Sequence, residues 1–151
     1  MCVDVLALSW SLRGVGSAKL TWSPAREEPV CIFTTYLGDG LSELVEMGIA
    51  LALGVRQSFA TLLGEPVGHR IFFSGDEKLY VEIVKFEDPM SPEGRWNHGK
   101  VRWAGQVSRF SFVESIRGMI ETVSDMHDLD EYERIWGFPF PAERYEMLRR
   151  L

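Results

Sequence analysis

The sequence is poor in cysteine and histidine, which limits the metal and redox chemistry that the chain can perform. Cys2 and Cys31 are the only cysteines in 151 residues, and neither belongs to a Cys-x-x-Cys pair or a Cys/His cluster. Structural zinc sites require such closely spaced ligands, so we expect no metal site. A disulfide between Cys2 and Cys31 would form only if their strands were neighbours, and the sequence leaves this open.

An excess of basic charge is also missing, as is any long apolar segment. The chain has 16 Lys and Arg against 22 Asp and Glu, a net charge of −6, whereas nucleic-acid binding needs a basic face. The longest apolar run, Met47 to Val55, is far shorter than the ~20 residues of a membrane span. The N-terminus lacks the basic segment of a signal peptide and carries Asp4. We therefore expect a cytoplasmic protein that binds neither nucleic acid nor membrane.

The residues that are present have the composition of an ordinary globular protein. Hydrophobic residues make up 46% and charged residues 25% of the chain, values typical of soluble domains with one core. No linker or compositional shift divides the sequence, so we predict a single α+β domain over residues 1–151. Five Trp, nine Phe and four Tyr recur along the chain, and most of them are expected in the core.

Alternating apolar residues and turn signals predict strands along much of the chain. Gly75 and Asp76 separate two β-favouring segments and form a typical hairpin turn, and Gly14 and Gly16 mark an earlier turn. Gly105 is expected at a bulge in the last strand. The patterns together predict an antiparallel sheet of about six strands in two three-strand meanders: residues 3–10, 18–23, 30–36, 69–75, 78–86 and 100–108.

A long central helix is predicted between the two meanders, followed by C-terminal helices packed on the sheet. Asp39 is a typical N-cap, apolar residues follow it at helical spacing, and Gly64 would end the helix near Leu63. The sequence from Ser111 to Glu114 matches a capping box and predicts the next helix. A further helical turn should end near Trp136, with a last helix over 142–151.

The sequence contains no recognisable catalytic motif. A Gly-x-Ser-x-Gly nucleophile turn is absent, and the Asp39 carboxylate stands where a phosphate would bind at the predicted helix start. His69, His98 and His127 are isolated from one another, and we interpret them as ordinary surface or partly buried histidines. We therefore expect no catalytic residue and no cofactor.

The best candidate for a partner surface is the acidic stretch from residue 125 to residue 133. Its negative potential could steer a basic protein partner, although a solvated helix end explains the same charges. Trp96, in a long predicted loop, would be an interface anchor if exposed. The polar face of the hairpin at 70–86, near Tyr80 and Glu82, is a second surface. The acids of the stretch are Asp125, Asp128, Asp130, Glu131 and Glu133.

Three short segments carry a family resemblance: Tyr36-Leu-Gly-Asp-Gly-Leu41, Gly64-Glu-Pro66, and Tyr132 with Trp136-Gly-Phe-Pro139. In their order, over residues 3–151, the chain resembles a family of small uncharacterised bacterial proteins. These share an Asp-x-Leu helix, a Glu-Pro before a hairpin and a C-terminal Trp-x-Phe-Pro. The resemblance implies no activity and no catalytic residue.

Two kinds of function remain open at this point. The first is a non-enzymatic protein-interaction module, immunity-like by analogy of size and acidity, since such proteins can neutralise toxins. The alternative is a small-ligand-binding protein or enzyme with a pocket between sheet and helices, where Glu65, His69 or Arg102 would have to converge. The exposed aromatics or sheet edges could also join copies of the chain into a homo-oligomer.

Overall fold

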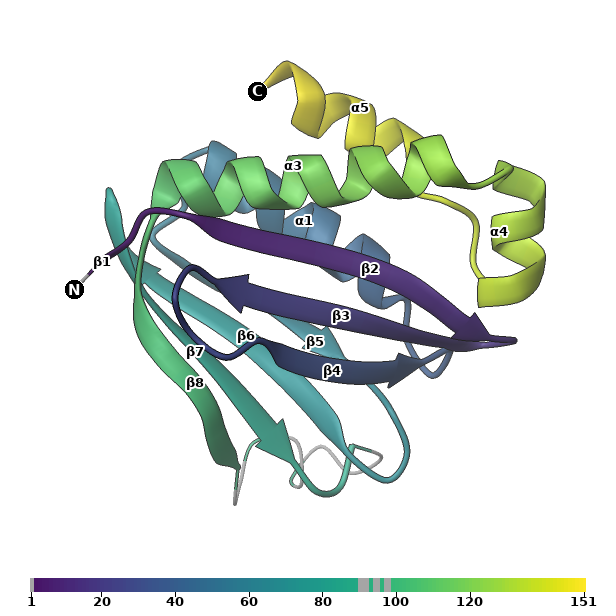
Figure 1. The fold of residues 1–151 in the computed structure, drawn as a ribbon, viewed down its shortest axis with the longest axis horizontal. Helices are drawn as coiled ribbons and strands as arrows, with labels where there is room; N and C mark the ends of the chain where they lie inside the picture. Colours follow the sequence, from purple (N-terminus) through teal and green to yellow (C-terminus); the bar gives the residue numbers. More distant parts are fainter. Residues whose placement is uncertain (1, 90–92, 94–95, 97–98) are drawn as a thin grey trace.

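The structure, a computed structural model, describes residues 2–89, 93, 96 and 99–151 (Figure 1). None of its helices in these segments combines the length and apolar character needed to cross a membrane. The predicted α+β class is confirmed. The helices and strands are β1 (Cys2–Val3), β2 (Leu6–Gly14), β3 (Ser17–Pro24), β4 (Val30–Thr35), α1 (Gly40–Ala52), β5 (Gln57–Leu62), β6 (Gly68–Gly75), β7 (Lys78–Phe86), β8 (Lys100–Ser108), α3 (Arg109–Met126), α4 (Leu129–Trp136) and α5 (Ala142–Arg150).

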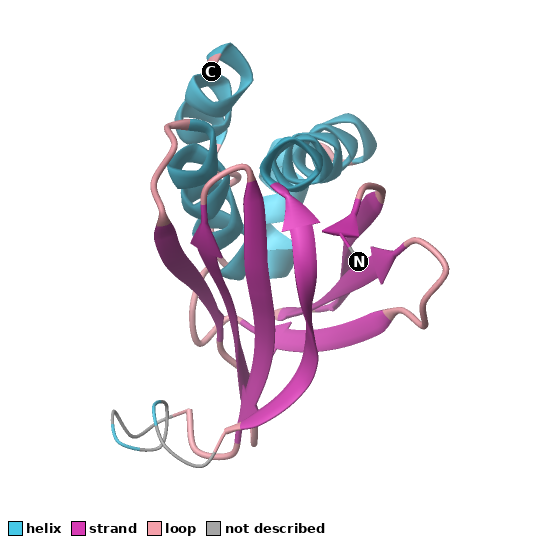
Figure 2. Ribbon diagram, turned by 90° about the vertical axis from the view of Figure 1, so that its left-hand side faces the viewer, coloured by secondary structure: helices cyan, strands magenta, loops and turns pink. Residues whose placement is uncertain are grey.

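The strands form two sheets instead of the single six-stranded sheet that the patterns predict. The smaller sheet has the order β2-β3-β4 and the larger one β1-β8-β7-β6-β5. Both predicted meanders are present, but β5 and β1 extend the second one at its edges, and β1 pairs with β8 in parallel. The split follows from the chain path, because α1 carries the chain from β4 to the far edge of the larger sheet. The two sheets lie at an angle to each other, with the helices on one side (Figure 2).

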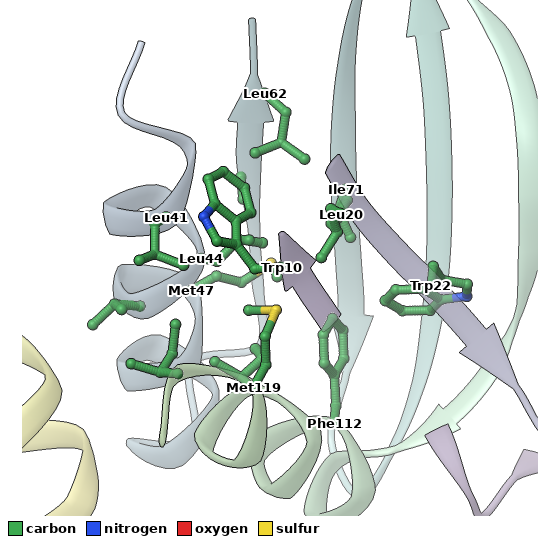
Figure 3. Packing of buried hydrophobic residues seen from close by; sticks show 14 of the residues in the cluster. Trp10, Leu20, Trp22, Leu41, Leu44, Met47, Leu62, Ile71, Phe112 and Met119 are labelled. Carbon is green, nitrogen blue, oxygen red and sulfur yellow. The ribbon is translucent and has the colours of Figure 1, made fainter. Parts of the chain in front are cut away.

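The core lies between the two sheets and helices α1 and α3 (Figure 3). Alternation along β3 turns Leu20 and Trp22 inward, where both are fully buried, and the rings of Trp22 and Phe112 lie 5.4 Å apart. Each buried side chain of this size contributes about 1.5–3 kcal/mol to stability. The buried face of α3 consists of the residues predicted for it: Phe112, Val113, Ile116, Met119, Ile120 and Val123.

Helix α1 begins as predicted but ends much earlier. Asp39 is its N-cap, and the side chain accepts a hydrogen bond from the Ser42 backbone N–H at 3.4 Å. The helix stops at Ala52, not near Leu63, because Gly54 takes a left-handed conformation with φ of 82°. The apparent continuation is β5, whose alternating residues pair along β6. A strand ladder and a buried inner face outweigh the helical spacing there.

The β-bulge in β8 lies at Arg102 and not at the predicted Gly105. The pairing between β7 and β8 shifts by one residue between Ile83 and Val84, which leaves Arg102 as the extra residue. Gly105 pairs regularly and is instead covered by the Trp103 ring, which a Cβ at this position would meet at 2.8 Å. The glycine therefore marks a close approach of a side chain.

Helix α3 begins two residues before the predicted capping box. Its N-cap is Ser108, whose side chain accepts a hydrogen bond from the Ser111 backbone N–H at 3.1 Å. The Ser111 hydroxyl is used elsewhere, because it donates to the Asp4 carbonyl at 2.6 Å. Helices α4 and α5 lie where the sequence predicts them. Cys2 and Cys31 are free thiols.

Candidate functional site

The acidic stretch at 125–133 lies at the end of α3 and in α4, and all of its acids are exposed. Asp128 is the N-cap of α4, where Oδ1 accepts hydrogen bonds from the backbone N–H groups of Asp130 and Glu131 at 3.0 and 3.1 Å. Asp130 and Glu131 occupy the first turn, where negative charge is favourable against the helix dipole. Three of the acids therefore have a local role in forming α4.

A second group of carboxylates surrounds a surface hollow of about 440 Å³ between α1 and β5. Glu43 accepts a hydrogen bond from the Thr61 backbone N–H at 3.1 Å, and burial raises the pKa of its carboxyl. Glu46 forms a two-pronged contact with Arg144 at 2.7 and 2.8 Å. Each of these carboxylates therefore already has a partner within the protein, which favours a structural role.

The outer face of the larger sheet presents apolar residues to solvent. The strand register places Phe59 and Phe72 side by side in one row, with Arg70 and Val101 in the next row on the same face. Helices α1, α3, α4 and α5 do not cover this face (Figure 2). Phe59 is 41% exposed, and Tyr80 and Val101 are also exposed. We call these residues, together with Trp96, the aromatic face: Phe59, Arg70, Phe72, Tyr80, Trp96 and Val101.

Trp96 and Arg70 form the centre of the aromatic face. The Arg70 guanidinium carbon lies 3.8 Å from the centre of the Trp96 ring and 5.3 and 5.2 Å from those of Phe59 and Phe86. Trp96 also meets Phe59 edge-on, with ring centres 5.3 Å apart. Arg70 is only 8% exposed, whereas Trp96 is 62% exposed. Cation–π contacts of this kind contribute ~0.5–2 kcal/mol, so the indole is held in place while much of its surface remains free.

Charge is sparse on the rest of the aromatic face. The Tyr80 hydroxyl donates a hydrogen bond to the Glu82 carboxylate, and this bond raises the pKa of Tyr80. The row around Tyr80 carries the uncharged Gln57, Ser74 and Gln106. Glu82 adds a carboxylate to this border, because it pairs with Phe72 across the strands. An apolar centre with a polar border is characteristic of a protein–protein interface.

Sequence reasoning named Trp96 as an anchor but missed the residues that hold it. Trp96 is exposed, which meets the condition for an interface anchor, whereas Phe59 fell inside the predicted long helix. The sequence signal that could have placed Phe59 in a strand is weak, because Phe59 and Ala60 are adjacent apolar residues and the segment from Ser58 to Leu62 does not alternate strictly. Arg70 offered no such signal, because its aromatic neighbours are distant in the sequence.

Comparison of the chain with protein-family models, with curated proteins and with solved structures gave no match. Its function therefore has to be argued from the geometry of the aromatic face and of the charged groups near it.

Proposed function

We propose that this chain is a non-enzymatic protein-interaction module and that the aromatic face is its contact surface. The observation that carries the proposal is the exposed Trp96 indole, held over Arg70 on the outer face of the larger sheet. Trp, Tyr and Arg are the residues most enriched among those that dominate binding energy. An anchor that is already ordered loses little conformational entropy on binding.

The partner is a folded protein with an apolar patch that fits the aromatic face and a net basic charge. The apolar patch follows from the sparse charge on this face, and the basic charge from the net charge of −6. Long-range attraction would speed the encounter, and the exposed acids at 125–133 contribute to this field. Neutralisation of a basic toxin, as by an immunity protein, is one role of this kind.

The test is to capture a partner with the tagged chain, identify and purify it, and measure its Kd by calorimetry. We expect Trp96→Ala to weaken binding by about 30-fold, the value that corresponds to a hot-spot loss of ~2 kcal/mol. Val15→Ala is the control, because Val15 is 87% exposed in the turn between β2 and β3 of the smaller sheet. Equal Kd values for Trp96→Ala and the wild type would refute the proposal, as would a loss that Val15→Ala shares.

A further inference from the structure

The inner face of the larger sheet ends in a row of basic side chains. His69, Lys85 and Lys100 are cross-strand neighbours on β6, β7 and β8. His69 and Lys85 lie on the same face as the paired core residues Ile71 and Ile83, because each is two positions away along its strand. Lys100 shares this face because it pairs with Lys85 across the bulge. The row lies where β7 ends and β8 begins, at the lower edge of the sheet in Figure 1.

Arg102, the extra residue of the bulge, joins this row to the smaller sheet. Its Nη1 donates to the Cys31 carbonyl of β4 at 2.8 Å and lies 3.1 Å from Nε2 of His69. A guanidinium can only donate, so Nε2 of His69 is the acceptor and the ring proton is on Nδ1. His69 is 3% exposed, not a surface or partly buried histidine as predicted. Among the residues that the structure describes, its buried Nδ1 finds no hydrogen-bond partner, which is costly for a donor.

The charges around His69 are predominantly positive. Burial, the Arg102 guanidinium and the Lys85 ammonium, in that order, lower the pKa of His69 to about 4. Glu87 lies 3.9 Å from Lys85 in an exposed pair, and Glu27 accepts a hydrogen bond from the Trp103 indole at 3.1 Å. The row therefore combines three cations around a buried, neutral His69 in a chain that is acidic as a whole.

We propose that Lys85, Lys100 and Arg102, next to the buried His69, bind a dianionic phosphate group of a small molecule. The three cations are donors, as an oxyanion requires, and the phosphate would compete with Glu87 for Lys85. An Arg fork binds two phosphate oxygens at once and Lys acts as a point charge. A dianion suits three cations better than a carboxylate does. This inference concerns a different surface from the aromatic face and does not depend on the proposed protein partner.

The test uses inorganic phosphate as the probe and NMR of the His69 ring and nearby amides, at constant ionic strength set with NaCl. We expect a saturable shift, with an apparent pKa of His69 that rises as phosphate is added. Arg102→Gln and Lys100→Gln should weaken binding at least about tenfold, as expected for the loss of a charge-assisted hydrogen bond. Lys78→Gln, at the opposite end of β7, is the matched control and should bind as the wild type does.

Several outcomes would overturn the inference. One is a response to phosphate that does not saturate or that NaCl reproduces. If Arg102→Gln does not fold, Arg102→Lys takes its place. A phosphate Kd that is unchanged in both Lys100→Gln and Arg102→Lys would also overturn the inference. Acetate that binds as tightly as phosphate would overturn the dianion assignment. Trp96→Ala should leave phosphate binding unchanged, so the outcome is independent of the test of the protein-interaction function.

Discussion

Acidification should destabilise this protein through His69 before most carboxylates are protonated. The pKa of the buried ring is lowered from 6.5 to about 4, so folding opposes its protonation. The associated stability is fully present above pH 6.5 and is lost as the pH falls through 4. From these two pKa values, linkage gives a loss of about 2 kcal/mol at pH 5 and about 3 kcal/mol at pH 4. Such a loss is a large part of the 5–15 kcal/mol that is usual for a domain.

The assay is urea unfolding at pH 7 and at pH 5, in buffers free of phosphate and sulfate, for the wild type and His69→Gln. The charged groups that face the ring are Arg102 and Lys85. The raised pKa of Glu43 acts in the opposite direction, because protonation of this carboxyl relieves its burial. His69→Gln shares that contribution, so the difference between the two proteins isolates the histidine. A wild type that loses no more stability than His69→Gln between pH 7 and pH 5 would refute the reasoning.

Two further predictions concern the ends of α1 and can be checked by urea unfolding. Gly54→Ala should destabilise the protein by about 1 kcal/mol, because φ at this position is 82°. As a control, Gly118→Ala, in α3 with open space around it, should stabilise the protein by ~0.5–1 kcal/mol. A change in the free energy of unfolding that has the same sign in both variants would contradict this prediction. Asp39→Ala should cost about 2 kcal/mol, because it removes the N-cap and the acceptor of the Trp136 indole N–H at 3.0 Å. Asp39→Asn retains an acceptor and should cost less; equal losses would show that the hydrogen bonds are not the cause.

The parts of the fold that depend on residues close together in the sequence could be predicted from the sequence. The hairpin of β6 and β7 was predictable because alternation and the turn at Gly75 are local signals. The cap at Asp39 and the exposure of the 125–133 acids are local in the same sense. The end of α1 could not be predicted in this way. Apolar residues recur past Gly54 into β5, and short apolar runs fit either a helix or a strand.

The candidate sites were less predictable because they are built from distant residues. Trp96 could be named as an anchor, but its support by Arg70 and Phe59 depends on the order of strands in the larger sheet. The burial of His69 depends on Arg102, which reaches it only because the bulge inserts an extra residue into β8. Tertiary pairing of this kind leaves no periodic pattern in the sequence.

The hydrogen bond between Asp39 and Trp136 also bears on the order in which the protein folds during synthesis. The two residues are 97 positions apart in the chain, and the indole is fully buried. A nascent chain that ends before α4 therefore lacks one of the contacts that hold the start of α1. Contacts of such long sequence separation form late and slow the folding of a domain. The first half of the chain should thus complete its packing only after residue 136 has left the ribosome.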